Sequence, residues 1–66
     1  MHDFKEGDYV IFVDDEKQSI NIITKLSSTN NRQVWVEDVA DRSNSGWSYV
    51  GWLKRVSVED GDITYG

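Results

Sequence analysis

Short runs of alternating residues, each ended by a turn-forming cluster, are the feature of this chain that most restricts its fold. Side chains of a strand point to its two faces in turn, so alternation over about four to eight residues is typical of strands. Five such runs occur within 66 residues: GDYVIFVDD (7–15), SINIITKL (19–26), QVWVED (33–38), WSYV (47–50) and RVSV (55–58). No segment shows sustained helical periodicity. The pattern predicts an all-β protein, and the short length favours one small five-stranded barrel.

Alternation also assigns side chains to faces. Both faces of the first run are mostly apolar, so this strand is expected to cross the core. The second run divides into a face with Asn21, Ile23 and Lys25 and a face with Ile20, Ile22, Thr24 and Leu26. In the third run, Val34 and Val36 are expected to point inward, with Trp35 and Glu37 on the opposite face. In the fourth, Trp47 and Tyr49 share one face.

The fourth run is followed by a break in the alternation. Gly51 permits a sharp bend, and two large apolar residues, Trp52 and Leu53, are adjacent. A single 3₁₀ turn is expected within GWLK (51–54), before the last core strand. Further on, Asp60-Gly61 is a hairpin signal, so residues 59–66 are expected to form a C-terminal hairpin or a tail. We expect one domain over residues 1–66, with its core at about 4–58.

Composition restricts the kinds of site that the chain can carry. There is no cysteine, and the one histidine, His2, lies beside the start, which excludes disulfides and argues against a zinc site. Twelve acidic and seven basic residues give a net charge of −5, which repels phosphate backbones. No signal-like segment or apolar run of membrane-spanning length occurs, which favours a soluble, cytoplasmic protein.

The residue types give little support for catalysis. The chain offers no cysteine nucleophile, no positioned histidine and no glycine-rich phosphate loop. Asp8 is the best carboxylate candidate, but after Gly7 it is expected to accept hydrogen bonds from local backbone N–H groups of a turn. We therefore expect no enzyme, no cofactor and no metal site.

The order of elements resembles that of small SH3-like barrels. The segments that carry the resemblance are FKEGDYVIFVDD (4–15) and WSYVGWLKRV (47–56). The resemblance is to the KOW- and Tudor-like branch, which includes compact barrels of bacterial and phage proteins. It implies five strands with a 3₁₀ turn, here at Trp52-Leu53-Lys54, before the last of them. The chain departs from peptide-binding SH3 domains because it has no ALYDY-type opening and no proline, and it is more acidic than KOW domains usually are.

Large aromatic residues are the candidates for a binding site. They are Tyr9, Trp35, Trp47, Tyr49 and Trp52. Rings of this size can equally fill the core of a small β domain, since each buries about 150–250 Å². Clustered at the surface with an acidic rim, they would favour a protein partner that carries cationic groups. This second interpretation predicts a non-enzymatic protein-interaction module.

Two other functions remain open from the charged residues. The acidic groups are Asp14-Asp15-Glu16, Glu37-Asp38 with Asp41, and Glu59-Asp60 with Asp62. They predict either solvated turns or a mimic of nucleic-acid charge that inhibits a nucleic-acid-handling enzyme. Lys54 and Arg55 beside the rings predict either a weak nucleic-acid binder of KOW type or charges that discourage edge pairing.

Overall fold

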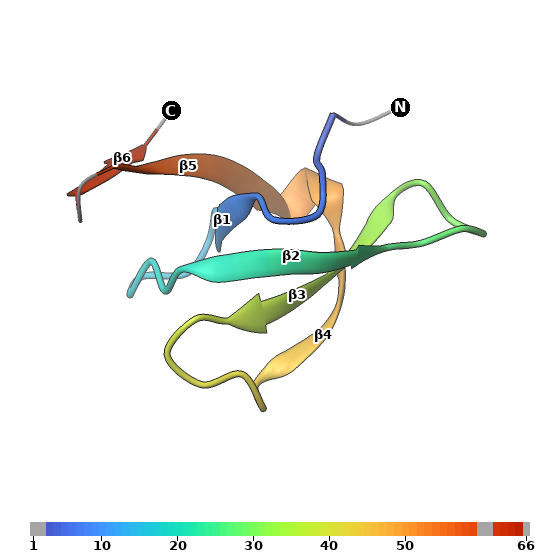
Figure 1. Cartoon of the computed structure of the whole chain (residues 1–66), viewed down its shortest axis with the longest axis horizontal. Helices are drawn as coiled ribbons and strands as arrows, with labels where there is room; N and C mark the ends of the chain where they lie inside the picture. Colours follow the sequence, from blue (N-terminus) through green and yellow to red (C-terminus); the bar gives the residue numbers. More distant parts are fainter. Residues whose placement is uncertain (1–2, 60–61, 66) are drawn as a thin grey trace.

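The computed structural model describes residues 3–59 and 62–65, which form one antiparallel sheet (Figure 1). Its elements are β1 (Tyr9–Phe12), β2 (Asn21–Leu26), β3 (Gln33–Asp38), β4 (Ser45–Tyr49), the 3₁₀ turn η1 (Val50–Trp52), β5 (Leu53–Glu59) and β6 (Asp62–Tyr65). In these residues the six strands lie in the order β4-β3-β2-β1-β5-β6. The predicted all-β class and the predicted 3₁₀ turn before β5 are confirmed.

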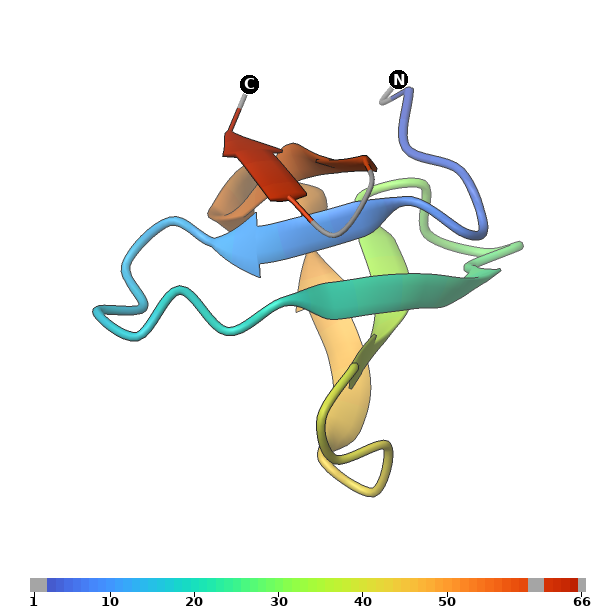
Figure 2. The same ribbon diagram turned by 60° about the vertical axis from the view of Figure 1, so that its left-hand side comes forward.

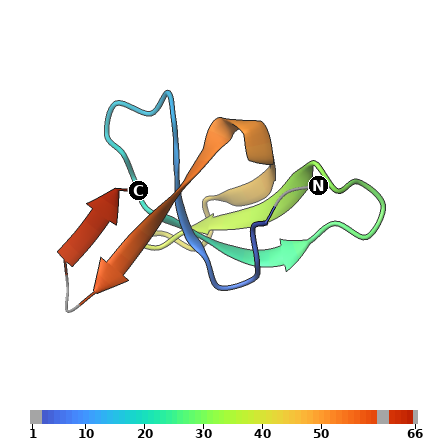
Figure 3. The ribbon, with the colours of Figure 1, turned by 90° about the horizontal axis from the view of Figure 1, so that it is seen from above.

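The sheet twists strongly along this order. In Figure 2, β1 and β2 run across β3 and β4, and Figure 3 shows the β5–β6 hairpin extending away from the β2–β4 meander. Within the described residues, β4 and β6 are the end strands, each paired with one neighbour. The structure therefore shows a twisted antiparallel sheet with two end strands.

The core is small and entirely aliphatic. It consists of Val10, Ile23, Val34, Val36 and Leu53, against which Phe4, Phe12 and Val50 pack. The predicted inward direction of Val34 and Val36 is confirmed, since both are buried between half-buried neighbours. Val10 and Ile11 are both buried although they are adjacent, so β1 has buried side chains on both faces, as predicted. Burial of an aliphatic side chain stabilises the folded state by about 1.5–3 kcal/mol. A core of so few side chains therefore supports only modest stability.

The predicted alternation of the second strand is wrong beyond Ile23. The pairing of β2 with β3 shifts register between Ile23 and Lys25, as at a β-bulge. An extra residue in one strand turns the following side chains to the other face. Lys25 is consequently placed opposite Trp35, with its Nζ 5.3 Å from the centre of the indole, and not on the core face with Ile23.

The position of the 3₁₀ turn also differs from the prediction. The turn covers Val50–Trp52, two residues before the expected 52–54. Leu53 is already extended, with φ −112° and ψ 147°, and it pairs with Phe12 of β1. The early start of β5 is stabilised by the burial of Leu53, because the leucine side chain then packs in the aliphatic core.

Candidate interaction surface

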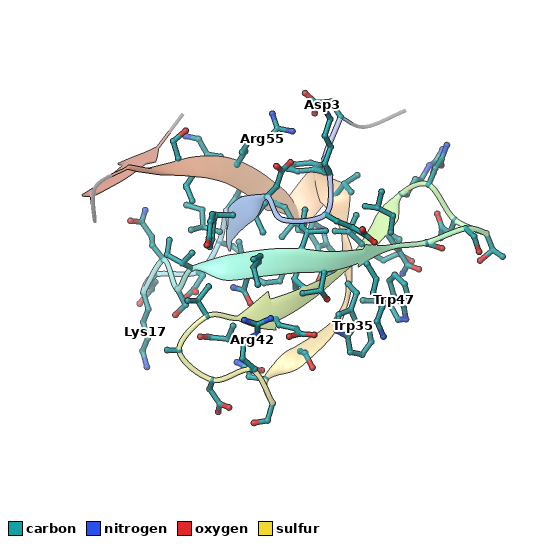
Figure 4. The ribbon with its side chains drawn as sticks, in the orientation of Figure 1. Asp3, Lys17, Trp35, Arg42, Trp47 and Arg55 are labelled. Atoms are coloured by element: carbon teal, nitrogen blue, oxygen red, sulfur yellow. The ribbon has the colours of Figure 1, made fainter. Side chains whose placement is uncertain are left out.

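Three of the five candidate rings lie on the outer face of β3 and β4, and a fourth, on η1, continues their row. Trp35 and Trp47 are cross-strand partners, and their ring centres are 5.4 Å apart in an edge-to-face arrangement (Figure 4). Tyr49 is two residues beyond Trp47 on the same face, and its ring meets that of Trp52 edge to face at 5.3 Å. We call Trp35, Trp47, Tyr49 and Trp52 the aromatic row.

Most of the aromatic row is exposed. Trp47 is 48% exposed, Tyr49 45% and Trp52 57%, whereas Trp35 is half-buried. Edge-to-face pairs contribute about 0.5–1.5 kcal/mol beyond area burial, so the rings stabilise one another. Trp47, Tyr49 and Trp52 nevertheless leave about half of their surface in contact with water. Rings that served only to fill the core would be more fully covered. A cluster of exposed large rings is typical of interaction sites.

The backbone around η1 fixes the end of the row. The N–H of Val50 donates to the carbonyl of Arg32 at 2.8 Å, and the N–H of Val13 donates to the carbonyl of Trp52 at 3.0 Å. Val13, which is 61% exposed, thereby lies beside the turn that carries Trp52. The local sequence carries no signal for Val13 as part of this surface, because its link to Trp52 joins segments far apart in the chain.

Tyr9 does not belong to this surface. It lies on β1, which β2 separates from β3, and it pairs with Ile22 and Val56. Its side chain is half-buried and makes no ring contact with the aromatic row in the part of the chain that the structure describes. The structure therefore brings together four of the five predicted residues and leaves Tyr9 apart.

The charges beside Trp35 are mixed in sign. Glu37 accepts hydrogen bonds from Trp35 Nε1 at 3.2 Å, Thr24 Oγ1 at 3.2 Å and Arg42 Nε at 2.8 Å. The Arg42 hydrogen bond is the main cause that holds the pKa of Glu37 below its ordinary value of 4.5; partial burial opposes it, and the bonds from Trp35 and Thr24 lower the pKa further. With Lys25 over the Trp35 ring, this part of the rim is not simply acidic.

The other acidic groups within the described residues mostly cap turns. Asp15 accepts backbone N–H groups of Lys17 and Ser19. Asp38 accepts those of Ala40 and Asp41, and Asp41 in turn accepts that of Ser43. Hydrogen bonds of this kind are common for aspartate side chains in turns and loops. Asp60 of the third predicted group lies outside the described residues.

Lys54 and Arg55 do not form a shared basic patch. As neighbours on β5 they point to opposite faces. Arg55 Nε lies 3.3 Å from Asp8 Oδ2, and its Nη2 donates to the carbonyl of Asp3 at 2.8 Å (Figure 4). Asp8 also accepts the backbone N–H of Lys5 at 2.9 Å, which confirms the predicted local role of this carboxylate.

The described residues contain neither a cluster of metal-ligand side chains nor a long apolar helix. No group of three or more His, Cys, Asp or Glu side chains in this part of the chain is arranged to hold a metal ion. The described residues also contain no helix with the length and apolar character required to cross a membrane.

Comparison of the chain with protein-family models, curated proteins and solved structures found no match.

Proposed function

We propose that this protein is a non-enzymatic interaction module that binds a protein partner through the aromatic row. The observation that supports this proposal is the exposure of Trp47, Tyr49 and Trp52, each by about half, on adjoining elements. Tryptophan and tyrosine are the residue types that most often dominate the energy of protein interfaces. Covering these rings would remove a large apolar area from water, which favours association.

We also propose that the sheet is a small SH3-like barrel. Two observations support this: β1 lies between β2 and β5, and a 3₁₀ turn connects β4 to β5. Such a scaffold would hold the aromatic row on the paired strands β3 and β4 and on η1. The geometry of the rings would then change little on binding, which limits the entropy cost of association.

Paired variants test the proposed binding surface. In the row variant, Trp47 and Trp52 are both replaced by serine; in the control variant, Leu26 and Val39 are. The two controls are also exposed, by 44% and 46%, but lie outside the aromatic row. We expect immobilised wild type and control variant to capture the same partner from a cell extract, and the row variant to lose it.

Folding and salt dependence complete the test. All variants are first compared by backbone NMR spectra, so that loss of fold is separated from loss of binding. Because ring contacts carry no net charge, we expect capture to persist at about 0.5 M salt, whereas a mimic of nucleic-acid charge would release its target. A folded row variant that retains the partner would refute the proposal, and release of the partner by salt would favour the inhibitor alternative.

A further inference from the structure

A polar cleft lies on the side of β4 opposite the aromatic row. Gly46 and Ser48 of β4 line it, and they alternate with Trp47 and Tyr49 along the strand. The cleft has a volume of about 270 Å³ and lies between the β1–β2 loop and the β3–β4 loop. Its other lining residues are Phe12, Asp15, Ser19, Asn21, Val36, Asp38, Asn44 and Ser45.

Two buried polar side chains in this cleft have hydrogen-bonding capacity that the protein does not use. Asn21 is 6% exposed and Ser48 is 8% exposed. The amide nitrogen of Asn21 donates to the carbonyl of Ser19 at 3.2 Å, but its Oδ1 and the hydroxyl of Ser48 have no partner among the described residues. No fully enclosed polar side-chain atom of these residues lacks a partner, so the two groups are accessible from the cleft. Both oxygens are therefore placed to accept N–H donors from a molecule that enters the cleft.

The lining is negative and has no internal counter-charge. Asp15 of the β1–β2 loop and Asp38 at the end of β3 contribute carboxylates, and no lysine, arginine or histidine lines the cleft. Asp38 uses Oδ1 for the backbone N–H groups of Ala40 and Asp41, while its Oδ2 has no hydrogen bond in the described structure. Phe12 and Val36 add an apolar surface to the lining. Acceptors, negative charge and an apolar wall therefore occur together.

We propose that this cleft binds one ammonium or guanidinium group carried on an aliphatic stem. Such a group supplies N–H donors to Asp38, Ser48 and Asn21, and charge-assisted bonds of this kind are the strong ones. The stem would lie against Phe12 and Val36. Clefts for drug-sized ligands measure about 300–1,000 Å³, so this smaller volume suits a single side chain or a small amine. The site is separate from the aromatic row, and its existence does not depend on the proposed function.

NMR titration of the full chain with small probes tests the proposal. The probes are N-acetyl-lysine methylamide, N-acetyl-arginine methylamide and butylammonium, with N-acetyl-norleucine methylamide as the uncharged control. We expect saturable shifts of the Asn21, Gly46 and Ser48 amides with at least one cationic probe, and none with the norleucine compound. Binding of butylammonium alone would assign a free amine, whereas a peptide-like probe that binds more tightly would assign a partner's side chain.

A matched pair of substitutions then locates the charge. Asp38→Asn keeps an oxygen for the turn bonds to Ala40 and Asp41 but removes the negative charge. Asp41→Asn makes the same change three residues further on, in the β3–β4 loop, at a residue that does not line the cleft. We expect Asp38→Asn to lower the affinity for the cationic probe by about tenfold or more, and Asp41→Asn to leave this affinity nearly unchanged.

A third substitution tests the buried hydroxyl. Ser48→Ala removes the unpartnered group and is expected to weaken binding a fewfold without loss of fold, because it deletes only one oxygen. The proposal fails if no cationic probe shifts these amides, if the norleucine compound shifts them equally, or if Asp38→Asn and Asp41→Asn have the same effect. A divalent metal ion that displaces the cationic probe and binds more tightly would also overturn it.

Discussion

Glu37 links three neighbouring side chains of the outer face through one carboxylate. Its Oε2 accepts from Trp35 and Thr24, and its Oε1 accepts from Arg42. Trp35 in turn holds Trp47 by ring contact. This single residue therefore helps to orient the half-buried indole at one end of the aromatic row. The free energy of unfolding should therefore depend on whether Glu37 is ionised.

The lowered pKa of Glu37 predicts a pH dependence with a definite sign. Because the folded-state pKa lies below the ordinary value of 4.5, the stabilisation is fully present above that value and is lost as the pH falls through the folded-state pKa. We expect Glu37→Gln to reduce the loss of urea resistance between about pH 6 and about pH 3. Arg42→Gln should reduce it similarly, since Arg42 is the main cause of the lowered pKa.

The double variant provides the control for this experiment. If Glu37 and Arg42 act through one hydrogen bond, replacing both should change the pH dependence no more than replacing Glu37 alone. Glu37→Gln with the full wild-type pH dependence would contradict the argument.

At the scale of elements, the turn that leads into β1 depends on one glycine. Gly7 has φ +92°, and its N–H donates to the carbonyl of Ile23 at 2.7 Å. An added Cβ would meet no atom within 4 Å, so the cost of a side chain here is conformational and not steric crowding by neighbours. Glycine is the residue that adopts this backbone conformation without strain.

Gly7→Ala is therefore expected to lower the free energy of unfolding by about 1–2 kcal/mol. Gly51→Ala is the matched control, since its added Cβ also meets nothing within 4 Å but its φ is not in the left-handed region. That change should be neutral or stabilise by a few tenths of a kcal/mol. Urea unfolding of both variants measures the difference, and equal stability would argue against the conformational explanation.

The elements differ in how well their sequences predict them. The positions of Val34 and Val36 follow from local alternation, because burial of one face of β3 requires it. The shift between Ile23 and Lys25 has no local signal, since it exists only in the pairing of β2 with β3. The start of β5 at Leu53 likewise depends on its pairing with Phe12, which the local sequence does not encode.

At the scale of the whole molecule, Arg55 attaches the N-terminal segment to β5. It contacts the carboxylates of Asp3 and Asp8, the Asp3 carbonyl and, at 5.3 Å, the ring of Phe4. Phe4 packs against the core, so this attachment helps to cover one side of it. Residues 3–8 are otherwise outside any strand.

Arg55→Gln is expected to loosen this segment with little loss of global stability. The ion pairs are partly exposed, and such pairs contribute about 0–1 kcal/mol. Heteronuclear NOE values of residues 3–5 should fall, while the urea midpoint changes little. Lys54→Gln, which alters the neighbouring residue on the opposite face, should change neither. An unchanged NOE profile in Arg55→Gln would show that Phe4 packing alone holds the segment.

The candidate surface was only partly predictable at this scale. That Trp47 and Tyr49 share a face, and that Trp35 lies outward, follows from alternation. Exposure of these rings does not, because it depends on whether another layer covers the outer face. The distance of Tyr9 from the aromatic row depends on strand order. The polar cleft had no sequence signal, since strand and loop residues that are remote in the chain form it.

The pairing of β1 with β5 has a consequence for how the chain reaches its fold. The β2–β3, β3–β4 and β5–β6 pairs join strands adjacent in sequence, whereas Tyr9 pairs with Val56 and Phe12 with Leu53. Contacts between distant residues carry a large loop-closure entropy and slow folding. Leu53 is also one of the core residues that Val10 needs as a neighbour. During synthesis, the protein therefore cannot complete its core until β5 has left the ribosome.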